Sequence, residues 1–203
     1  MARRVKEEPK VHRERIAGAA EKLFLKNGIE ETTVNDIAEA AGYSKATLYV
    51  YFENKGAIVS YLVLRSMSLL KELIMSKTSR RKTDKANFLG ICRAVLEYRK
   101  EYPVYFILLQ DNINVDFSDT DGLTDDMETY KTGEAINSYI SELFGLENDA
   151  FIRIFTFWGA LSGIITMAYA KKDYIEKQSG LDQEAFLEKS FLFLFDGMVK
   201  CGV

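Results

Sequence analysis

Helical spacing of apolar residues, interrupted by short glycine turns, is the pattern that most constrains this chain's fold. Between residues 11 and 27, four apolar side chains share one helix face: Ile16, Ala20, Leu23 and Phe24. Asn27-Gly28 is expected to end this helix, because glycine readily takes the left-handed conformation of a helix stop. The chain is therefore expected to begin with a short amphipathic helix that packs against other elements.

Two further short helices follow, joined by a glycine turn. Thr33 is the expected N-cap of the first, and Ser44, after the turn at Gly42, is the expected N-cap of the second. A long fourth helix then runs to about Lys77. Two short helices joined in this way form a helix-turn-helix, which here spans about residues 33–52.

The third helix carries side chains suited to DNA. Ser44, Lys45 and Thr47 place hydrogen-bonding groups on its first turn, where a recognition helix faces base edges. Tyr49 follows, and Lys55 stands at the start of the fourth helix. The free N–H groups and positive dipole end of that helix suit a phosphate. These residues favour a DNA-binding role for the helix-turn-helix.

The run from Arg15 to Ala57 resembles the TetR family of transcriptional repressors. The residues that carry the resemblance are Phe24, Gly28, Thr33, Ile37, Ala38, Gly42, Ser44, Leu48, Tyr49, Phe52 and Lys55. The resemblance implies that the third helix enters the major groove. It implies base contacts from Ser44, Lys45, Ala46 and Thr47, and phosphate contacts from Thr33, Tyr49 and Lys55. Val50 departs from the family pattern, which often has histidine there, and is not predicted to bind DNA.

The charge of the N-terminal sixty residues is nearly balanced, with ten Lys and Arg against nine Asp and Glu. A separate DNA-binding domain is usually more basic. The first fifteen residues carry a net charge of +3, from six basic and three acidic side chains. Two interpretations stay open for this arm: it follows a phosphate backbone or minor groove, or it is a solvated tail.

The remaining sequence predicts an all-α protein of about nine helices. After the first four, the expected helices span about residues 85–101, 103–110, 123–144, 148–171 and 182–200. The expected domains are a DNA-binding domain over 10–70 and a ligand-binding and dimerisation domain over 71–203. The basic stretch 77–85 between the fourth and fifth helices either touches DNA or is a solvated loop, and we favour the loop.

The last two expected helices are apolar on nearly all sides. The segment 154–170 has no charged residue over seventeen positions and contains Gly159 and Gly163. That length lies at the lower edge of a membrane span, and a central bundle helix is the favoured interpretation. Because one chain has too few helices to cover both faces, we expect a second copy to pack there. Related proteins pair through their last two helices, and such a homodimer would read a palindrome.

Aromatic residues in the C-terminal domain predict a pocket for an apolar or aromatic small molecule. The candidate lining residues are Tyr98, Tyr105, Phe106, Tyr130, Phe155 and Trp158. Core packing is the alternative for each of them taken singly.

Catalytic and metal-binding motifs are missing from this sequence. It has one histidine, His12, and two cysteines, Cys92 and Cys201, so a His-rich metal cage or a four-cysteine zinc site is excluded. The acidic stretch 111–128 resembles part of an EF-hand loop, but Phe117 replaces its first ligand. We predict no enzymatic activity, cofactor or metal site.

These features together predict a cytoplasmic, ligand-responsive homodimeric repressor, which small-molecule binding releases from a palindromic DNA operator. Two alternatives stay open. The protein could be a helical ligand-binding or catalytic bundle whose N-terminal hairpin is only structural. It could also be an activator, because repression depends on where the operator lies relative to a promoter.

Overall fold

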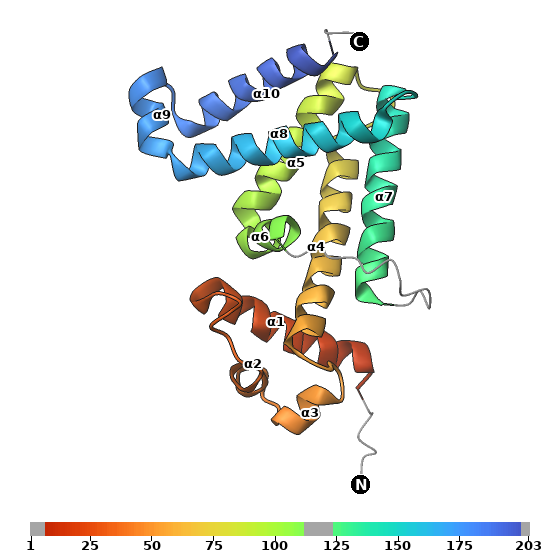
Figure 1. Cartoon of the computed structure of the whole chain (residues 1–203), viewed down its shortest axis with the longest axis vertical. Coiled ribbons are helices and arrows are strands. Elements are labelled where there is room, and N and C mark those ends of the chain that lie inside the picture. Colours follow the sequence, from red (N-terminus) through yellow and green to blue (C-terminus); the bar gives the residue numbers. More distant parts are fainter. Residues whose placement is uncertain (1–6, 112–123, 200–203) are drawn as a thin grey trace. The chain divides into compact units, whose positions relative to one another are not determined.

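The computed structural model describes residues 7–111 and 124–199, and all regular structure in them is helical (Figure 1). The all-α prediction is thereby confirmed. The helices are α1 Pro9–Asn27, α2 Val34–Ala41, α3 Lys45–Tyr49, α4 Lys55–Lys77, α5 Asp84–Glu101, α6 Pro103–Asp111, α7 Asp125–Phe144, α8 Ala150–Ala170, α9 Lys172–Ser179 and α10 Gln183–Val199.

One described helix, α9, was not expected. It is an eight-residue polar helix with no buried residue, so it has no apolar periodicity from which to predict it. Gly180, with φ of 67°, ends it, and its backbone N–H donates to the carbonyl of Glu176. The helix lies in the connection predicted between the last two helices.

The described residues form two compact units. One lies within residues 1–69 and 99–132, and the other within residues 70–98 and 133–203. The first unit therefore contains the helix-turn-helix segment together with α6 and the first two turns of α7. The three helices α4, α5 and α7 each contribute residues to both units.

The first unit is built around the apolar face of α1. Its fully or nearly buried residues include Ile16, Ala17, Ala20 and Phe24 on α1, Ile37, Ala38 and Ala41 on α2, Leu48 on α3, and Ile58 and Leu62 on α4. As predicted, α1 stops at Gly28, whose φ is 84° and whose N–H donates to the carbonyl of Phe24 at 3.0 Å.

The second unit has an aromatic and aliphatic core. Phe88 on α5 makes edge contacts with Phe157 on α8 and Phe195 on α10, at centroid distances of 5.1 and 5.3 Å. Cys92 is fully buried in this core, and burial raises the pKa of its thiol, so it acts as a small apolar residue. Gly90 allows close approach of α5 to the end of α4, because an added Cβ would lie 2.6 Å from the carbonyl oxygen of Lys77.

Helix α8 buries one face and exposes the other. The buried face comprises Ile154, Phe157, Leu161, Ile165 and Ala168. The exposed face carries Phe151, Ile152, Phe155 and Met167, each more than half exposed. By length and composition α8 could cross a membrane, and only 22% of its most apolar window is buried. Within a single chain α8 is therefore covered on one side only, and covering its other side would require a partner molecule.

Candidate nucleic-acid interface and ligand cavity

The turn between α2 and α3 is fixed by local hydrogen bonds. Gly42 takes the left-handed conformation, with φ of 74°, and its N–H donates to the carbonyl of Ala38 or Glu39. Ser44 then caps α3, because its hydroxyl accepts from the backbone N–H of Thr47 at 3.1 Å. Both features agree with the predicted helix-turn-helix.

Helix α3 is anchored on one side and exposed on the other. Leu48 is fully buried, while its neighbour Tyr49 is 46% exposed. The other exposed side chains of this segment are Ser44, Lys45, Ala46 and Val50, and Thr47 is half-buried. All the predicted base-reading residues are therefore at least partly accessible. We call the accessible residues of this segment the α3 surface: Ser44, Lys45, Ala46, Thr47, Tyr49 and Val50.

Val50 was excluded from the predicted site, yet it is 75% exposed on the α3 surface. Its position follows from helix geometry, since it lies four residues after Ala46 and so shares its face. The i, i+4 spacing from Ala46 was the signal that could have included it. An aliphatic side chain here can contact a thymine methyl group but cannot bind a phosphate.

Three of the hydroxyl groups predicted to contact DNA already form hydrogen bonds within the protein. The Ser44 and Thr47 hydroxyls lie 2.8 Å apart and share a hydrogen bond. The Thr33 hydroxyl donates to Asp36 at 2.6 Å, and the backbone N–H of Thr33 donates to the same carboxylate at 2.9 Å. These bonds hold the pKa of Asp36 below its ordinary value. The N-terminus of α2 is thus already capped by an anionic group, the Asp36 carboxylate.

Lys55 also has partners inside the first unit. Its ammonium donates to the carbonyl oxygens of Ile29 and Glu30, at 2.8 and 3.2 Å. An ammonium has three N–H donors, so one is left for another acceptor. The side chain therefore joins the start of α4 to the loop after α1, in addition to any phosphate contact.

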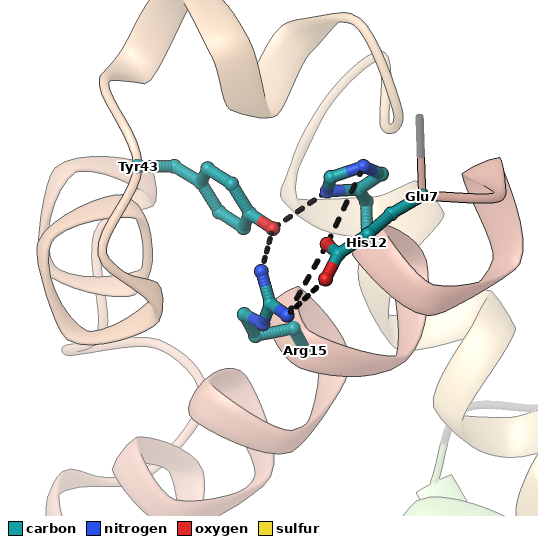
Figure 2. A network of polar contacts seen from close by, with 4 residues as sticks. All are labelled: Glu7, His12, Arg15 and Tyr43. Carbon is teal, nitrogen blue, oxygen red and sulfur yellow. Dashed lines mark hydrogen bonds and ion pairs between the residues drawn. The ribbon is translucent and has the colours of Figure 1, made fainter. Parts of the chain in front are cut away.

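A polar network joins the turn before α3 to α1, as Figure 2 shows. The Tyr43 hydroxyl lies 2.7 Å from His12 Nδ1 and accepts from Arg15 Nη1 at 2.7 Å. Arg15 also donates to Glu7, and hydrogen bonds to Glu7 and Tyr43 raise the pKa of Arg15. His12 stacks on Tyr51 at 4.8 Å. The chain's single histidine is therefore part of the packing beneath α3.

The basic N-terminal arm is partly outside the described residues, since Arg3, Arg4 and Lys6 are not among them. Within the described part, Arg13 and Arg15 are both engaged by other side chains of the protein. Neither is a free basic group on a disordered tail.

Comparison with known proteins bears on this first unit. The model for "Bacterial regulatory proteins, tetR family" matches residues 16–62, which contain α2, α3 and the turn between them. The N-terminal region, residues 16–62, is therefore a TetR-family regulatory domain.

Known relatives match about a third of this chain. It is 44% identical over 63 residues to the HTH-type transcriptional regulator TtgR of Pseudomonas putida, covering 31% of this chain and 30% of that protein. It is 38% identical over 74 residues to the probable acrEF/envCD operon repressor of Escherichia coli, covering 36% and 33%. The chain thus matches about a third of the length of these relatives.

Solved structures resemble the chain over most of its length. The fatty acid degradation regulator FadR from Bacillus halodurans aligns with a TM-score of 0.65 and 20% identity, covering 94% of this chain and 96% of that one. A putative tetR family transcription regulator from Shewanella aligns with a TM-score of 0.64 and 18% identity, covering 89% and 96%. At these identities the likeness shows the fold alone.

The six predicted pocket residues have different environments. Tyr98, Tyr105 and Phe106 are buried, whereas Tyr130 is 38% and Phe155 is 69% exposed. Tyr105 donates to Glu21 at 2.8 Å, and its burial raises its pKa. The Trp158 indole donates to Asn137 at 3.0 Å. Tyr105 is thus a helix-to-helix contact, while Phe155 is a surface side chain.

A cavity of about 590 Å³ lies in the second unit and is lined by other residues. Its apolar walls are Phe88, Ile91, Ile140, Phe144, Leu146, Ile152, Ile154, Phe157 and Met198. Its polar lining is Asp84, Glu147, Asn148, Arg153 and Thr156. The volume lies within the range of small-molecule sites. Sequence periodicity gives no sign that these residues border a cavity.

The two remaining segments singled out in the sequence, the acidic stretch 111–128 and the basic stretch 77–85, add little to a candidate site. Most of the acidic stretch 111–128 lies outside the described residues, and no metal-binding group of side chains is found in the described ones. In the basic stretch, Lys77 pairs with Glu97, and Lys82 donates to the carbonyl of Lys77 at 2.7 Å. Arg80 pairs with Glu142.

Proposed function

We propose that the chain is a DNA-binding transcriptional regulator without enzymatic activity, and that it acts in the cytoplasm as a homodimeric repressor. The observation that carries this proposal is the α3 surface, held outward by buried Leu48 within the region that matches the TetR family. Lys45, Ala46, Tyr49 and Val50 are exposed there without any hydrophobic cover from the described residues. A duplex with an accessible major groove is the partner that such a surface fits.

Selection of random duplex DNA on the purified protein, at two salt concentrations, tests this function. A recovered palindrome would support dimeric base reading, and weaker binding at the higher salt would support phosphate contacts. Failure at both salts with folded protein would favour a helical ligand-binding bundle instead. The nearly balanced charge of the first sixty residues makes that the second candidate.

Lys45 and Tyr49 should affect binding in different ways. Lys45→Ala is expected to change the base preferred at one position of the half-site, because the exposed ammonium would read a base edge. Tyr49→Ala is expected to weaken all duplexes to a similar degree, because its hydroxyl would meet a phosphate. Anisotropy measured on single-base variants of the selected duplex separates the two effects. Equal losses on all duplexes for Lys45→Ala would reject base reading by Lys45.

We further propose that the dimer forms through α8 and α10. Phe155 and Met167 on α8 and Phe193 on α10 are exposed, and Phe193 is 77% exposed. Gly159 and Gly163 lie between Phe155 and Met167 on the exposed side of α8. Small residues flanked by large apolar ones allow two helices to approach closely and bury the larger side chains.

The cavity in the second unit is the proposed site for a small-molecule effector. Three phenylalanines line it, namely Phe88, Phe144 and Phe157, together with several aliphatic residues. Such walls suit an apolar or aromatic compound, and the few polar groups would orient it. Release from DNA requires that the compound prefer the conformation with low DNA affinity.

Filling the cavity should weaken ligand binding. Ile152 lines the cavity and is 61% exposed, so a larger side chain can be accepted there without forcing the core apart. We expect Ile152→Trp to lower the affinity for the uncharged dye N-phenyl-1-naphthylamine by about tenfold, through loss of about 1.4 kcal/mol of contact energy. Dye fluorescence titration measures this. Ile107→Trp, on α6 and 48% exposed, is the matched control and should bind dye normally. Normal dye binding by Ile152→Trp would move the effector site elsewhere.

A further inference from the structure

Arg13 on α1 is turned toward other helices of the first unit. Its guanidinium carbon lies 4.8 Å from the ring centroid of Phe52 and 4.3 Å from that of Tyr61. Phe52 follows α3 closely in sequence, and Tyr61 lies on α4. Because a cation is attracted to the face of an aromatic ring, Arg13 holds the end of the α3 segment and α4 together.

A carboxylate from α7 fixes the position of this guanidinium. Arg13 Nη2 donates to Asp125 Oδ2 at 2.6 Å, and the two side chains are 32% and 23% exposed. Asp125 is the first residue of α7. Arg13 Nε is buried without a hydrogen-bond partner in the described structure. Asp125 is therefore the acceptor on which the orientation of Arg13 depends.

Phe52 transmits the position of Arg13 to the recognition helix. Its ring is 2% exposed, and its backbone N–H donates to the carbonyl of Leu48 at 3.1 Å. Leu48 is the buried anchor of α3, and Phe52 continues the backbone hydrogen bonding of that helix. A shift of the guanidinium would therefore move the segment that bears the α3 surface.

We propose that Arg13 is a positioning residue for the recognition helix and that Asp125 makes this positioning depend on α7. This inference rests on the proposed DNA-binding function. Helix α7 also carries two residues of the cavity wall, Ile140 and Phe144, in its last turns. One helix thus bears both the carboxylate that holds Arg13 and part of the proposed effector site. A compound that changes where α7 begins would change the affinity for DNA.

A direct phosphate contact by Arg13 is the competing explanation, and the salt dependence of binding separates the two. Each lost phosphate contact lowers the slope of log affinity against log salt by about one. A positioning residue that does not touch DNA leaves that slope unchanged while lowering affinity at every salt concentration. The Arg13→Gln variant removes the charge and therefore tests this difference.

The experiment uses the full-length protein and the duplex recovered by selection, with anisotropy measured at several salt concentrations. Asp125→Ala is expected to weaken binding about tenfold, Asp125→Asn by less, and Arg13→Gln by at least as much as Asp125→Ala, all with the wild-type salt slope. Glu142→Ala is the matched control. Glu142 also lies on α7, and its carboxylate pairs with a different arginine, Arg80. It should change affinity less than twofold.

Amide hydrogen exchange gives a second measurement that does not require DNA. Asp125→Ala should speed exchange of the backbone N–H groups of Leu48, Tyr51 and Phe52 about tenfold while α8 amides keep their rates. Wild-type affinity together with unchanged exchange in both Asp125 variants would overturn the proposal. So would a salt slope lowered by one in Arg13→Gln. If the wild-type protein bound no duplex, the DNA-binding function would fail, and the exchange rates alone would then decide whether Asp125 positions α3.

Discussion

Replacing Phe193 with glutamate is expected to leave the protein monomeric and to weaken binding to the selected duplex by about 100-fold or more. Phe193 is 77% exposed on α10, and α10 packs against α8 within the second unit. In the proposed dimer this ring is buried against the partner's α8 and α10. A buried carboxylate without a cationic partner strongly opposes association. A monomer would then bind one half-site without the gain that comes from linking two.

Sedimentation velocity measures the oligomeric state, and anisotropy measures the affinity. Leu25→Glu is the matched control, because Leu25 is 63% exposed on α1 and lies outside the proposed interface. It should sediment as a dimer. A Phe193→Glu variant that remains dimeric at micromolar concentration would show that the chains pair elsewhere. A wild-type protein that is monomeric would reject the dimer itself.

Leu48→Ala is expected to destabilise the first unit by about 2–5 kcal/mol, the range found for deleting a buried leucine side chain. Leu48 is fully buried, and α3 is only five residues long. A helix of that length is not stable alone, so its position depends on what it packs against. Without the Leu48 side chain, the α3 surface loses its support, and DNA binding should fall even where the protein still folds.

Urea unfolding followed by far-ultraviolet circular dichroism measures this loss, with Leu25→Ala as the matched control. Leu25 is largely exposed, and its truncation should cost well under the value for Leu48. If the two variants were equally stable, Leu48 would not be the anchor of α3. Retained DNA affinity in Leu48→Ala would show that α3 is held by other contacts, such as those of Tyr43 and Phe52.

Local signals allowed the helix-turn-helix to be predicted accurately. Gly28 and Gly42 stop helices because they adopt positive φ, and Ser44 caps α3 through its own neighbour Thr47. These interactions involve residues at most a few positions apart, so the sequence displays them directly. The bond from Lys55 to the loop after α1 joins residues 26 positions apart, and no local pattern reveals it.

The residues that line the cavity could not be predicted from the sequence. Aromatic composition indicated a pocket, but the cavity is bordered by Phe88, Phe144 and Phe157, which were not among the predicted residues. Hydrophobicity tells whether a side chain prefers to be buried. Whether it then meets another side chain or an unfilled space depends on how several helices pack, and one sequence does not specify that. The Arg13–Asp125 pair, 112 residues apart, escaped prediction for the same reason.

The position of Trp158 has a consequence for spectroscopy. It is the only tryptophan among 203 residues, and it lies in the second unit beside Phe157, at a centroid distance of 5.1 Å. Because Phe157 lines the cavity, the emission of Trp158 should respond to a bound compound without any added label. The same emission follows unfolding of the second unit only. A fluorescence melting curve of Leu48→Ala could therefore look like that of the wild type while the first unit is already unfolded.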